Sequence, residues 1–188
     1  MLRLERCIAL AAALACDPEQ APEAADAVEF DDEAEDLAAP PRPSETYSGW
    51  TSFTSEEYPP IGCDPGSLVT RFGCRGSYCD NVRLYCTPSG QASGSAYWTG
   101  YFSEEGYDYR QCDAGFWLSA IACRGSYCDN IALQCTYYPQ VTPRNCYWTG
   151  WVSEEGGGEL PFGTDYYARG VQCDGSYCDN KRFFVCQK

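Results

Sequence analysis

The stretch Cys123-Arg-Gly-Ser-Tyr-Cys-Asp-Asn130 occurs three times in this chain with almost no change. The other copies are Cys74-Arg-Gly-Ser-Tyr-Cys-Asp-Asn81 and Cys173-Asp-Gly-Ser-Tyr-Cys-Asp-Asn180, so the period is about 50 residues. A fixed period of this length indicates one supersecondary unit used three times, each too small to bury a core alone. We expect the units to span residues 47–88, 89–140 and 141–188.

A second stretch repeats in step with the first. Its copies are Trp50-Thr-Ser-Phe-Thr-Ser-Glu-Glu57, Trp98-Thr-Gly-Tyr-Phe-Ser-Glu-Glu105 and Trp148-Thr-Gly-Trp-Val-Ser-Glu-Glu155. The tryptophans are either sugar-stacking surface residues or core residues repeated three times. We favour the core, because large aromatic side chains dominate protein interiors.

Apolar residues alternate with other residues after the repeated turns, as in Val82, Leu84 and Cys86, and in Ile131, Leu133 and Cys135. This period of two is typical of half-buried strands, and no helical pattern follows the N-terminal leader. We therefore expect an all-β domain of three or four strands per unit with pseudo-threefold symmetry: a β-prism, or alternatively a β-trefoil. One extra residue precedes Cys186 in the third unit, which we interpret as a β-bulge.

The cysteine count predicts a disulfide framework. The chain has 14 cysteines and no histidine, and 12 of the cysteines lie four to a unit. An even, evenly spread set in an exported chain is typical of disulfides. A zinc site is the alternative, but the export signal and the lack of histidine argue against it, and we assign no metal-ligating residue.

The spacing also predicts which cysteines pair. The four residues between the cysteines of each repeated stretch can form a tight turn that places both thiols across a hairpin. In the third unit Phe162 stands at the position of Cys63 and Cys112, while Cys146 appears before Trp148. Closing a loop such as that from Cys112 to Cys135 stabilises the fold by about 3 kcal/mol. We expect the pairs Cys63–Cys86, Cys74–Cys79, Cys112–Cys135, Cys123–Cys128, Cys146–Cys186 and Cys173–Cys178.

Residues 1–15 have the features of a signal peptide, because two arginines precede an apolar run that ends in small residues. The end of this run, Ala13-Leu14-Ala15-Cys16, is similar to a lipobox, in which the Cys16 thiol is acylated after cleavage. We expect an extracytoplasmic protein that is either anchored to the cell envelope by this lipid, its one membrane contact, or freely secreted.

Residues 16–46 are predicted to be a disordered acidic tether. They carry 11 acidic residues and one basic residue, Arg42, and are rich in alanine and proline. The tether holds most of the net charge of −14, so the domain that follows is only mildly acidic. Without a basic stripe to neutralise phosphates, nucleic acid is excluded as a partner. Oligomeric state is not predicted.

Three features recur together in each of the first two units. In the second they are Trp98, Cys112-Asp-Ala-Gly115 and Asn130-Ile-Ala-Leu-Gln-Cys135, and in the first Trp50, Cys63-Asp-Pro-Gly66 and Asn81-Val-Arg-Leu-Tyr-Cys86. In these features the units resemble those of the vitelline membrane outer layer protein I family. The resemblance implies a β-prism fold and an association with carbohydrate. It also implies a disulfide bond between the first and last cysteines quoted for each unit, Cys63 with Cys86 and Cys112 with Cys135. The stapled turn and the Ser-Glu-Glu stretch depart from the family's pattern.

The turn tips are the candidate ligand-binding sites. Tyrosine faces stack on sugar rings, and adjacent carboxylate and amide groups bond sugar hydroxyls or ligate calcium, which is the one cofactor considered. The alternative, which we favour for the Asp-Asn pairs, is that they satisfy the backbone of the turn. Three shallow sites would give avidity. The residues are Tyr78, Asp80, Asn81, Tyr127, Asp129, Asn130, Tyr177, Asp179 and Asn180.

No catalytic residue is expected. The absence of histidine removes Ser-His-Asp and Cys-His sites, and all twelve thiols of the domain are assigned to disulfides. Glu104 and Glu105 would point to opposite faces of a strand, and Ser-Glu-Glu-Gly reads best as a solvated turn. We interpret the chain as a non-catalytic, lectin-like module for glycans or another cell-surface component. A structural envelope or matrix protein is the alternative, and a glycoside hydrolase comes third.

Overall fold

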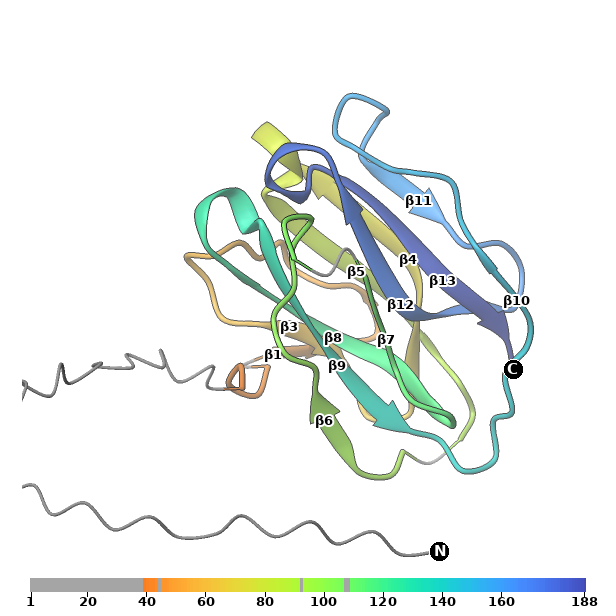
Figure 1. The fold of residues 1–188 in the computed structure, drawn as a ribbon. Coiled ribbons are helices and arrows are strands. Elements are labelled where there is room, and N and C mark those ends of the chain that lie inside the picture. Colours follow the sequence, from red (N-terminus) through yellow and green to blue (C-terminus); the bar gives the residue numbers. More distant parts are fainter. Residues whose placement is uncertain (1–38, 44, 92, 107–108) are drawn as a thin grey trace, which may run out of the picture. The chain divides into compact units, whose positions relative to one another are not determined.

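The computed structural model describes residues 39–43, 45–91, 93–106 and 109–188, and shows an all-β domain (Figure 1). The expected signal peptide, the lipidation site Cys16 and the tether up to residue 38 lie outside the described residues. The boundary expected at residue 46 falls inside the first strand. Among the described residues no helix has the length and apolar character needed to cross a membrane.

Each unit contributes four strands and a one-turn 3₁₀ helix, and one further strand precedes the first unit's four. The preceding strand is β1 (Glu45–Tyr47), and the first unit has β2 (Gly49–Trp50), β3 (Ile61–Cys63), β4 (Ser67–Arg75), η1 (Ser77–Cys79) and β5 (Asn81–Pro88). The second has β6 (Ala96–Trp98), β7 (Tyr109–Gln111), β8 (Phe116–Arg124), η2 (Ser126–Cys128) and β9 (Asn130–Tyr137). The third has β10 (Arg144–Trp148), β11 (Glu159–Pro161), β12 (Tyr166–Asp174), η3 (Ser176–Cys178) and β13 (Asn180–Gln187).

A long antiparallel hairpin from each unit forms the centre of one sheet, and the turns of the three hairpins meet at one end of the domain (Figure 1). The sheets run β11-β4-β5-β2, β1-β3-β8-β9-β6 and β10-β13-β12-β7. Each hairpin pairs on one side with a strand of its own unit and on the other with a strand from the preceding unit. Strand β3 of the first unit pairs with β8 of the second, and β7 of the second pairs with β12 of the third. Strand β11 of the third unit pairs with β4 of the first and closes the cycle. This closed cycle of exchanged strands was not predicted.

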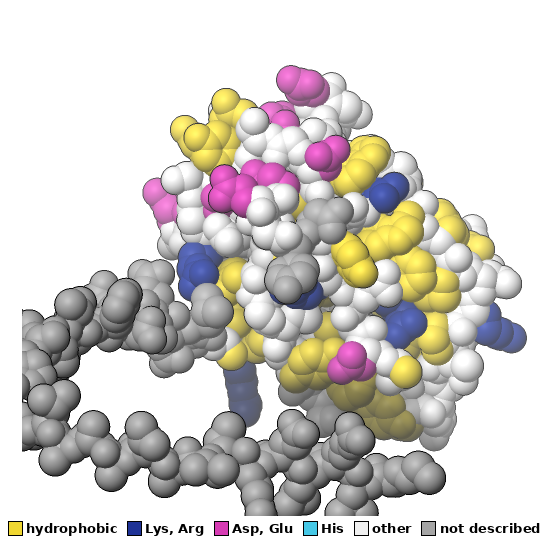
Figure 2. Space-filling model, in the orientation of Figure 1, with side chains coloured by type: hydrophobic (Ala, Val, Ile, Leu, Met, Phe, Trp, Pro, Cys, Tyr) yellow, Lys and Arg dark blue, Asp and Glu magenta, His cyan; other side chains and the backbone are white. Residues whose placement is uncertain are grey.

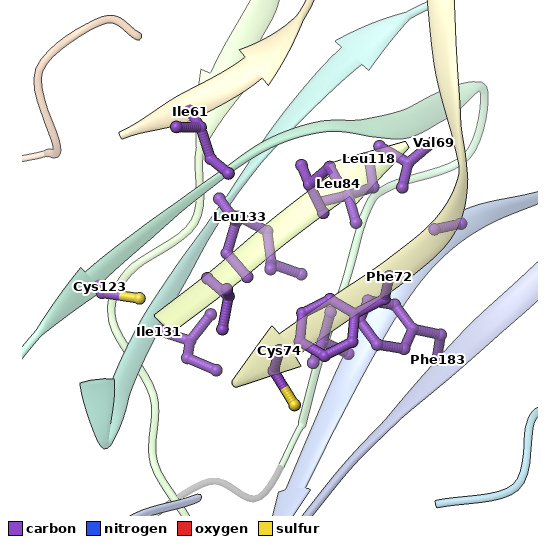
Figure 3. Packing of buried hydrophobic residues seen from close by; sticks show 14 of the residues in the cluster. Ile61, Val69, Phe72, Cys74, Leu84, Leu118, Cys123, Ile131, Leu133 and Phe183 are labelled. Carbon is purple, nitrogen blue, oxygen red and sulfur yellow. The ribbon is translucent and has the colours of Figure 1, made fainter. Parts of the chain in front are cut away.

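The interior where the three sheets face one another is filled by the inward residues of the hairpins. The Phe183 ring lies beside that of Phe72 (Figure 3), with centroids 4.8 Å apart, and its centroid is 5.0 Å from that of Phe162. A second cluster closes the end far from the turns and takes an equivalent residue from each unit, Leu68, Trp117 and Tyr167. Three sheets around a shared core confirm the β-prism and exclude the trefoil alternative.

The repeated tryptophans do not form the core, and that expectation was wrong. Trp50, Trp98 and Trp148 are half-buried on the outer faces of the sheets. The strand register explains this position. Each tryptophan pairs with a residue that neighbours an inward-facing residue and therefore faces outward, as Tyr85 does opposite Trp50. On this face the guanidinium of Arg83 lies 4.1 Å from the Trp50 ring centroid.

All six disulfides join the expected cysteines. Three staple the turns, and two tie β3 and the residue after β7 to the last strand of their units. A set of this size is typical of proteins that fold in an oxidising, extracytoplasmic environment.

The third unit departs from the framework more than its sequence indicated. Val185 pairs with Tyr147 as Cys135 pairs with Tyr97, so Val185 and not Cys186 holds the position of Cys135. Cys186 is the next residue and belongs to the second cluster. The expected bulge before Cys186 is absent from β13. The register shift lies instead on β10, between Arg144 and Tyr147, while the shifts in β4, β8 and β12 are common to all three units.

Candidate functional site: the tyrosine apex

The three stapled turns form a tip that we call the tyrosine apex, defined by Tyr78, Tyr127 and Tyr177. Their ring centroids lie 5.0 to 5.2 Å apart, and each pair is tilted by about 60°. Between 37% and 40% of each residue is exposed. The sequence predicted three separate shallow sites, whereas the fold brings the tyrosines into one cluster.

Each turn holds its tyrosine in an unusual backbone conformation. Tyr127 has φ 57° and Cys128 has φ 58°, in the left-handed region that non-glycine residues seldom adopt. Such a conformation persists only where the surroundings hold it. The Cys123–Cys128 disulfide and the tight approach at Gly125 supply that restraint.

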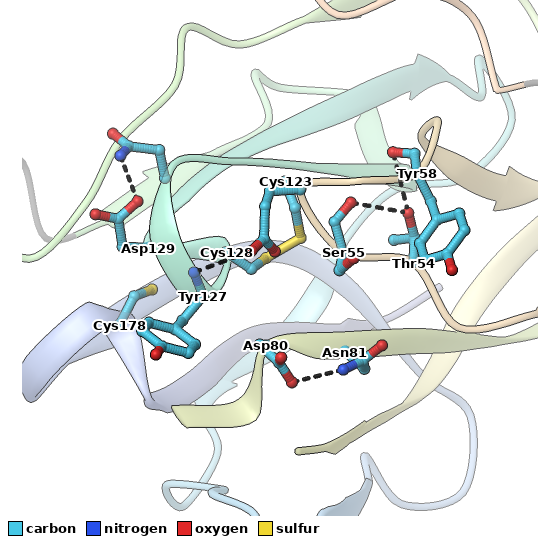
Figure 4. Close-up of a disulfide and its surroundings, with 12 residues drawn as sticks. Thr54, Ser55, Tyr58, Asp80, Asn81, Cys123, Tyr127, Cys128, Asp129 and Cys178 are labelled. Atoms are coloured by element: carbon cyan, nitrogen blue, oxygen red, sulfur yellow. Dashed lines mark hydrogen bonds between the residues drawn. A yellow bond between two sulfur atoms is a disulfide. The ribbon is translucent and has the colours of Figure 1, made fainter. Parts of the chain in front are cut away.

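The Asp-Asn pair that follows each turn stabilises it. The amide of Asn81 donates to the carboxylate of Asp80 at 2.6 Å, as drawn in Figure 4. The same Asp80 oxygen occupies the space that a side chain at Gly76 would need. The pairs Asp129–Asn130 and Asp179–Asn180 repeat this bond. The geometry therefore favours the structural role for these six residues over direct ligand binding.

Glutamates of the repeated Ser-Glu-Glu stretch reach the turns of neighbouring units. The backbone N–H of Tyr78 donates to Glu154 at 2.9 Å, and that of Tyr127 donates to Glu56 at 3.3 Å. The third unit thus supports the turn of the first, and the first supports that of the second. Our interpretation of this stretch as a solvated turn missed the contact. The one available signal was that the stretch repeats in step with the turns.

A buried lysine lies beneath the apex. Lys181 is fully buried at the position that Val82 and Ile131 hold in the other units, and its ammonium donates to the carbonyl of Cys178 at 2.5 Å. Burial lowers the pKa of Lys181 to about 8, although nearby carboxylates, Asp179 first and then Glu154, oppose the shift. The sequence showed only that a lysine interrupts an apolar position.

Acidic groups surround the apex. Asp and Glu side chains gather over the upper part of the face in Figure 2, the end at which the turns lie. The Oε2 atoms of Glu104 and Glu154 are buried without a hydrogen-bond partner among the described residues. No group of three or more His, Cys, Asp or Glu side chains that could hold a metal ion occurs in the described ranges.

Comparison of the chain with protein-family models, curated proteins and solved structures finds no match. The apex therefore has to be interpreted from its own geometry.

Proposed function

We propose that this protein is a non-catalytic binding module that recognises a glycan, or another component of a cell surface, through the tyrosine apex. The observation that carries the proposal is the convergence of Tyr78, Tyr127 and Tyr177 on one exposed tip. Tyrosine combines an apolar ring, which packs on the C–H face of a sugar, with a hydroxyl that hydrogen-bonds the sugar's own hydroxyls. No described residue bonds the three phenolic oxygens of the apex, so they are available to a ligand.

Rigidity of the tip supports the same function. Disulfides, Asp-Asn pairs and glutamates from neighbouring units hold the turns before any ligand arrives. A preorganised surface loses less conformational entropy on binding, which favours affinity for a ligand with few contacts. Because the tyrosines adjoin, they would act as one contact area instead of three linked sites.

The six disulfides and the N-terminal sequence support an extracytoplasmic location for this module. We propose that the signal peptide directs export, that Cys16 carries a lipid or the chain is secreted, and that the acidic segment keeps the domain away from the membrane. The resemblance to the vitelline membrane outer layer protein I family, with its carbohydrate association, supports the same ligand class.

A structural envelope or matrix protein remains the second candidate. The closed cycle of exchanged strands and the six disulfides favour it, because both contribute to durability and neither is needed for binding.

A glycan array separates the two candidates. The mature, oxidised protein should bind at least one glycan class, and Tyr127→Ala should reduce the signal about tenfold through loss of one aromatic contact. The matched control is Tyr109→Ala, which removes a tyrosine that is 50% exposed on β7, outside the apex. Absence of signal from every glycan, or equal loss in the control, would favour the structural role.

A further inference from the structure

A hollow lies near each of the three junctions between units. The first–second and third–first hollows have matching linings, formed by the segment after β3 or β11 and by the long hairpin of the next unit. The second–third hollow is lined by the segment after β7, by residues of the stretch 137–143 and by Arg169. Their volumes are about 360, 590 and 400 Å³ for the first–second, second–third and third–first junctions. Cavities of several hundred Å³ are in the range of small-molecule sites.

At the second–third junction a side chain of the protein itself shows what the hollow can bind. The guanidinium of Arg169 donates to the carbonyls of Asp113 at 2.6 Å, Phe116 at 3.0 Å and Cys112 at 3.1 Å. The carbonyls of the bounding segment therefore accept hydrogen bonds from a polar group placed in the hollow. At the first–second junction Arg42 and Pro43 line the hollow.

At the third–first junction the repeat places short side chains in the hollow. Thr70 stands where Arg169 stands in the third unit, and its hydroxyl bonds that of Thr87 at 2.8 Å. Gly163 is the counterpart of Asp113. The segment after β11 thus has no arginine bonded to it, and its Phe162 carbonyl accepts a hydrogen bond from the Tyr147 hydroxyl at 2.8 Å instead.

Charged groups at this junction differ from those of the other two. Asp165 has φ 61° where Gly66 and Gly115 have φ 87° and 81°, so a carboxylate takes a backbone position that favours glycine. The guanidinium of Arg71 lies 5.1 Å from the Tyr85 ring centroid. Neither Arg71 nor Asp165 has an ion-pair partner in the part of the chain that the structure describes. Aspartate tolerates this conformation better than most side chains do, so the turn can place a carboxylate at this hollow.

We infer that the third–first hollow is a binding pocket for one neutral, hydroxylated sugar ring. Asp165 accepts hydrogen bonds, Arg71 donates them, and Thr70 does both, which matches the mixed donors and acceptors of a sugar. One carboxylate and one guanidinium cancel in charge, so the pocket favours a neutral ring. Phe162 and Tyr167, both buried, supply the apolar part of the lining.

The test is a titration of the mature, oxidised, ¹⁵N-labelled protein with D-glucose, D-galactose, D-mannose and N-acetyl-D-glucosamine, followed by NMR. At least one sugar should shift the amide signals of Thr70, Gly163 and Asp165, saturating at a dissociation constant of about 1 mM, which is usual for a single weakly held ring.

Two variants probe the pocket without disturbing the fold. Asp165→Gly installs the residue that the other units carry, and Thr70→Arg installs the long side chain of the third unit. Each should weaken binding at least about tenfold, because a charge-assisted bond or the space itself is lost. Tyr127→Ala should keep the affinity, which separates this pocket from the apex.

Shifts that persist in both Asp165→Gly and Thr70→Arg would overturn the inference. The same holds if none of the four sugars moves the three amide signals. Either failure would leave the proposal for the apex standing, since that proposal is tested on Tyr127.

Discussion

Replacing Lys181 by isoleucine should remove a pH dependence of stability that the buried ammonium causes. Isoleucine is the residue at the equivalent position 131, so the apolar shape is one that the fold already accommodates. Burial lowers the pKa of the Lys181 ammonium from its ordinary value of 10.5 to about 8 in the folded protein. Between these values the unfolded chain binds more protons than the folded chain, so stability rises with pH.

The size of the effect follows from the two pKa values. Each pKa unit corresponds to about 1.4 kcal/mol, so the wild-type free energy of unfolding should rise by about 2 kcal/mol between pH 8 and pH 10. Measurements should stop near pH 10. Burial raises the pKa of Tyr138 to about 12, so that its contribution to stability is lost as pH rises above about 10.

The assay is urea unfolding at 25 °C across this pH range, with free thiols blocked. Wild type should gain stability relative to Lys181→Ile as the pH rises from 8 to 10. Near pH 7, where the ammonium is charged in both states, the difference between the two proteins should no longer change with pH. Ile131→Val is the control, because it removes a methyl group at the equivalent position and should cost about 1 kcal/mol at every pH. Parallel curves for wild type and Lys181→Ile from pH 8 to pH 10 would refute the reasoning.

Three further substitutions test the packing of the apex and the core. Glu154→Gln should lower the free energy of unfolding by about 1 kcal/mol, because the bond to the Tyr78 N–H loses its charge, whereas exposed Glu155→Gln should not; equal effects in urea unfolding would contradict this. Gly125 has φ 77°, and an added methyl group would meet the Asp129 carboxylate, so Gly125→Ala should lower the free energy of unfolding by about 1–3 kcal/mol. Gly150 has open space around it, so Gly150→Ala should be nearly neutral when both variants are compared by thermal unfolding. Phe72→Ala should cost about 3–5 kcal/mol through the cavity that it leaves between the sheets, and a loss under 1 kcal/mol would argue against the core as described.

Features of this fold that depend on short sequence spacings could be predicted from the sequence. The strand alternation at Leu84 and Leu133 and the pairing of the cysteines depend on short spacings, and both are confirmed. The third unit shows the limit of such reasoning. Counting residues back from Cys186 suggested an insertion in β13, but the shift lies on the partner strand, where Cys146 is found.

Contacts between units could not be predicted, because they depend on closure of the whole domain. Spacing within one unit carries no information about which sheet receives β3, β7 or β11. The same holds for the tyrosines, since each turn tip looks like a separate surface site until the three hairpins are placed around one axis. Side-chain size misled us for Trp50, whose register places it outside.

The return of β11 to the first unit has a consequence for biogenesis. A polypeptide is synthesised from its N-terminus, so β4 leaves the ribosome long before residues 159–161 follow it. Until then the edge of β4 has no permanent neighbour, and an unpaired edge invites intermolecular aggregation. The first repeat to emerge is therefore among the last to be completed, which leaves a chaperone or isomerase a defined interval in which to act.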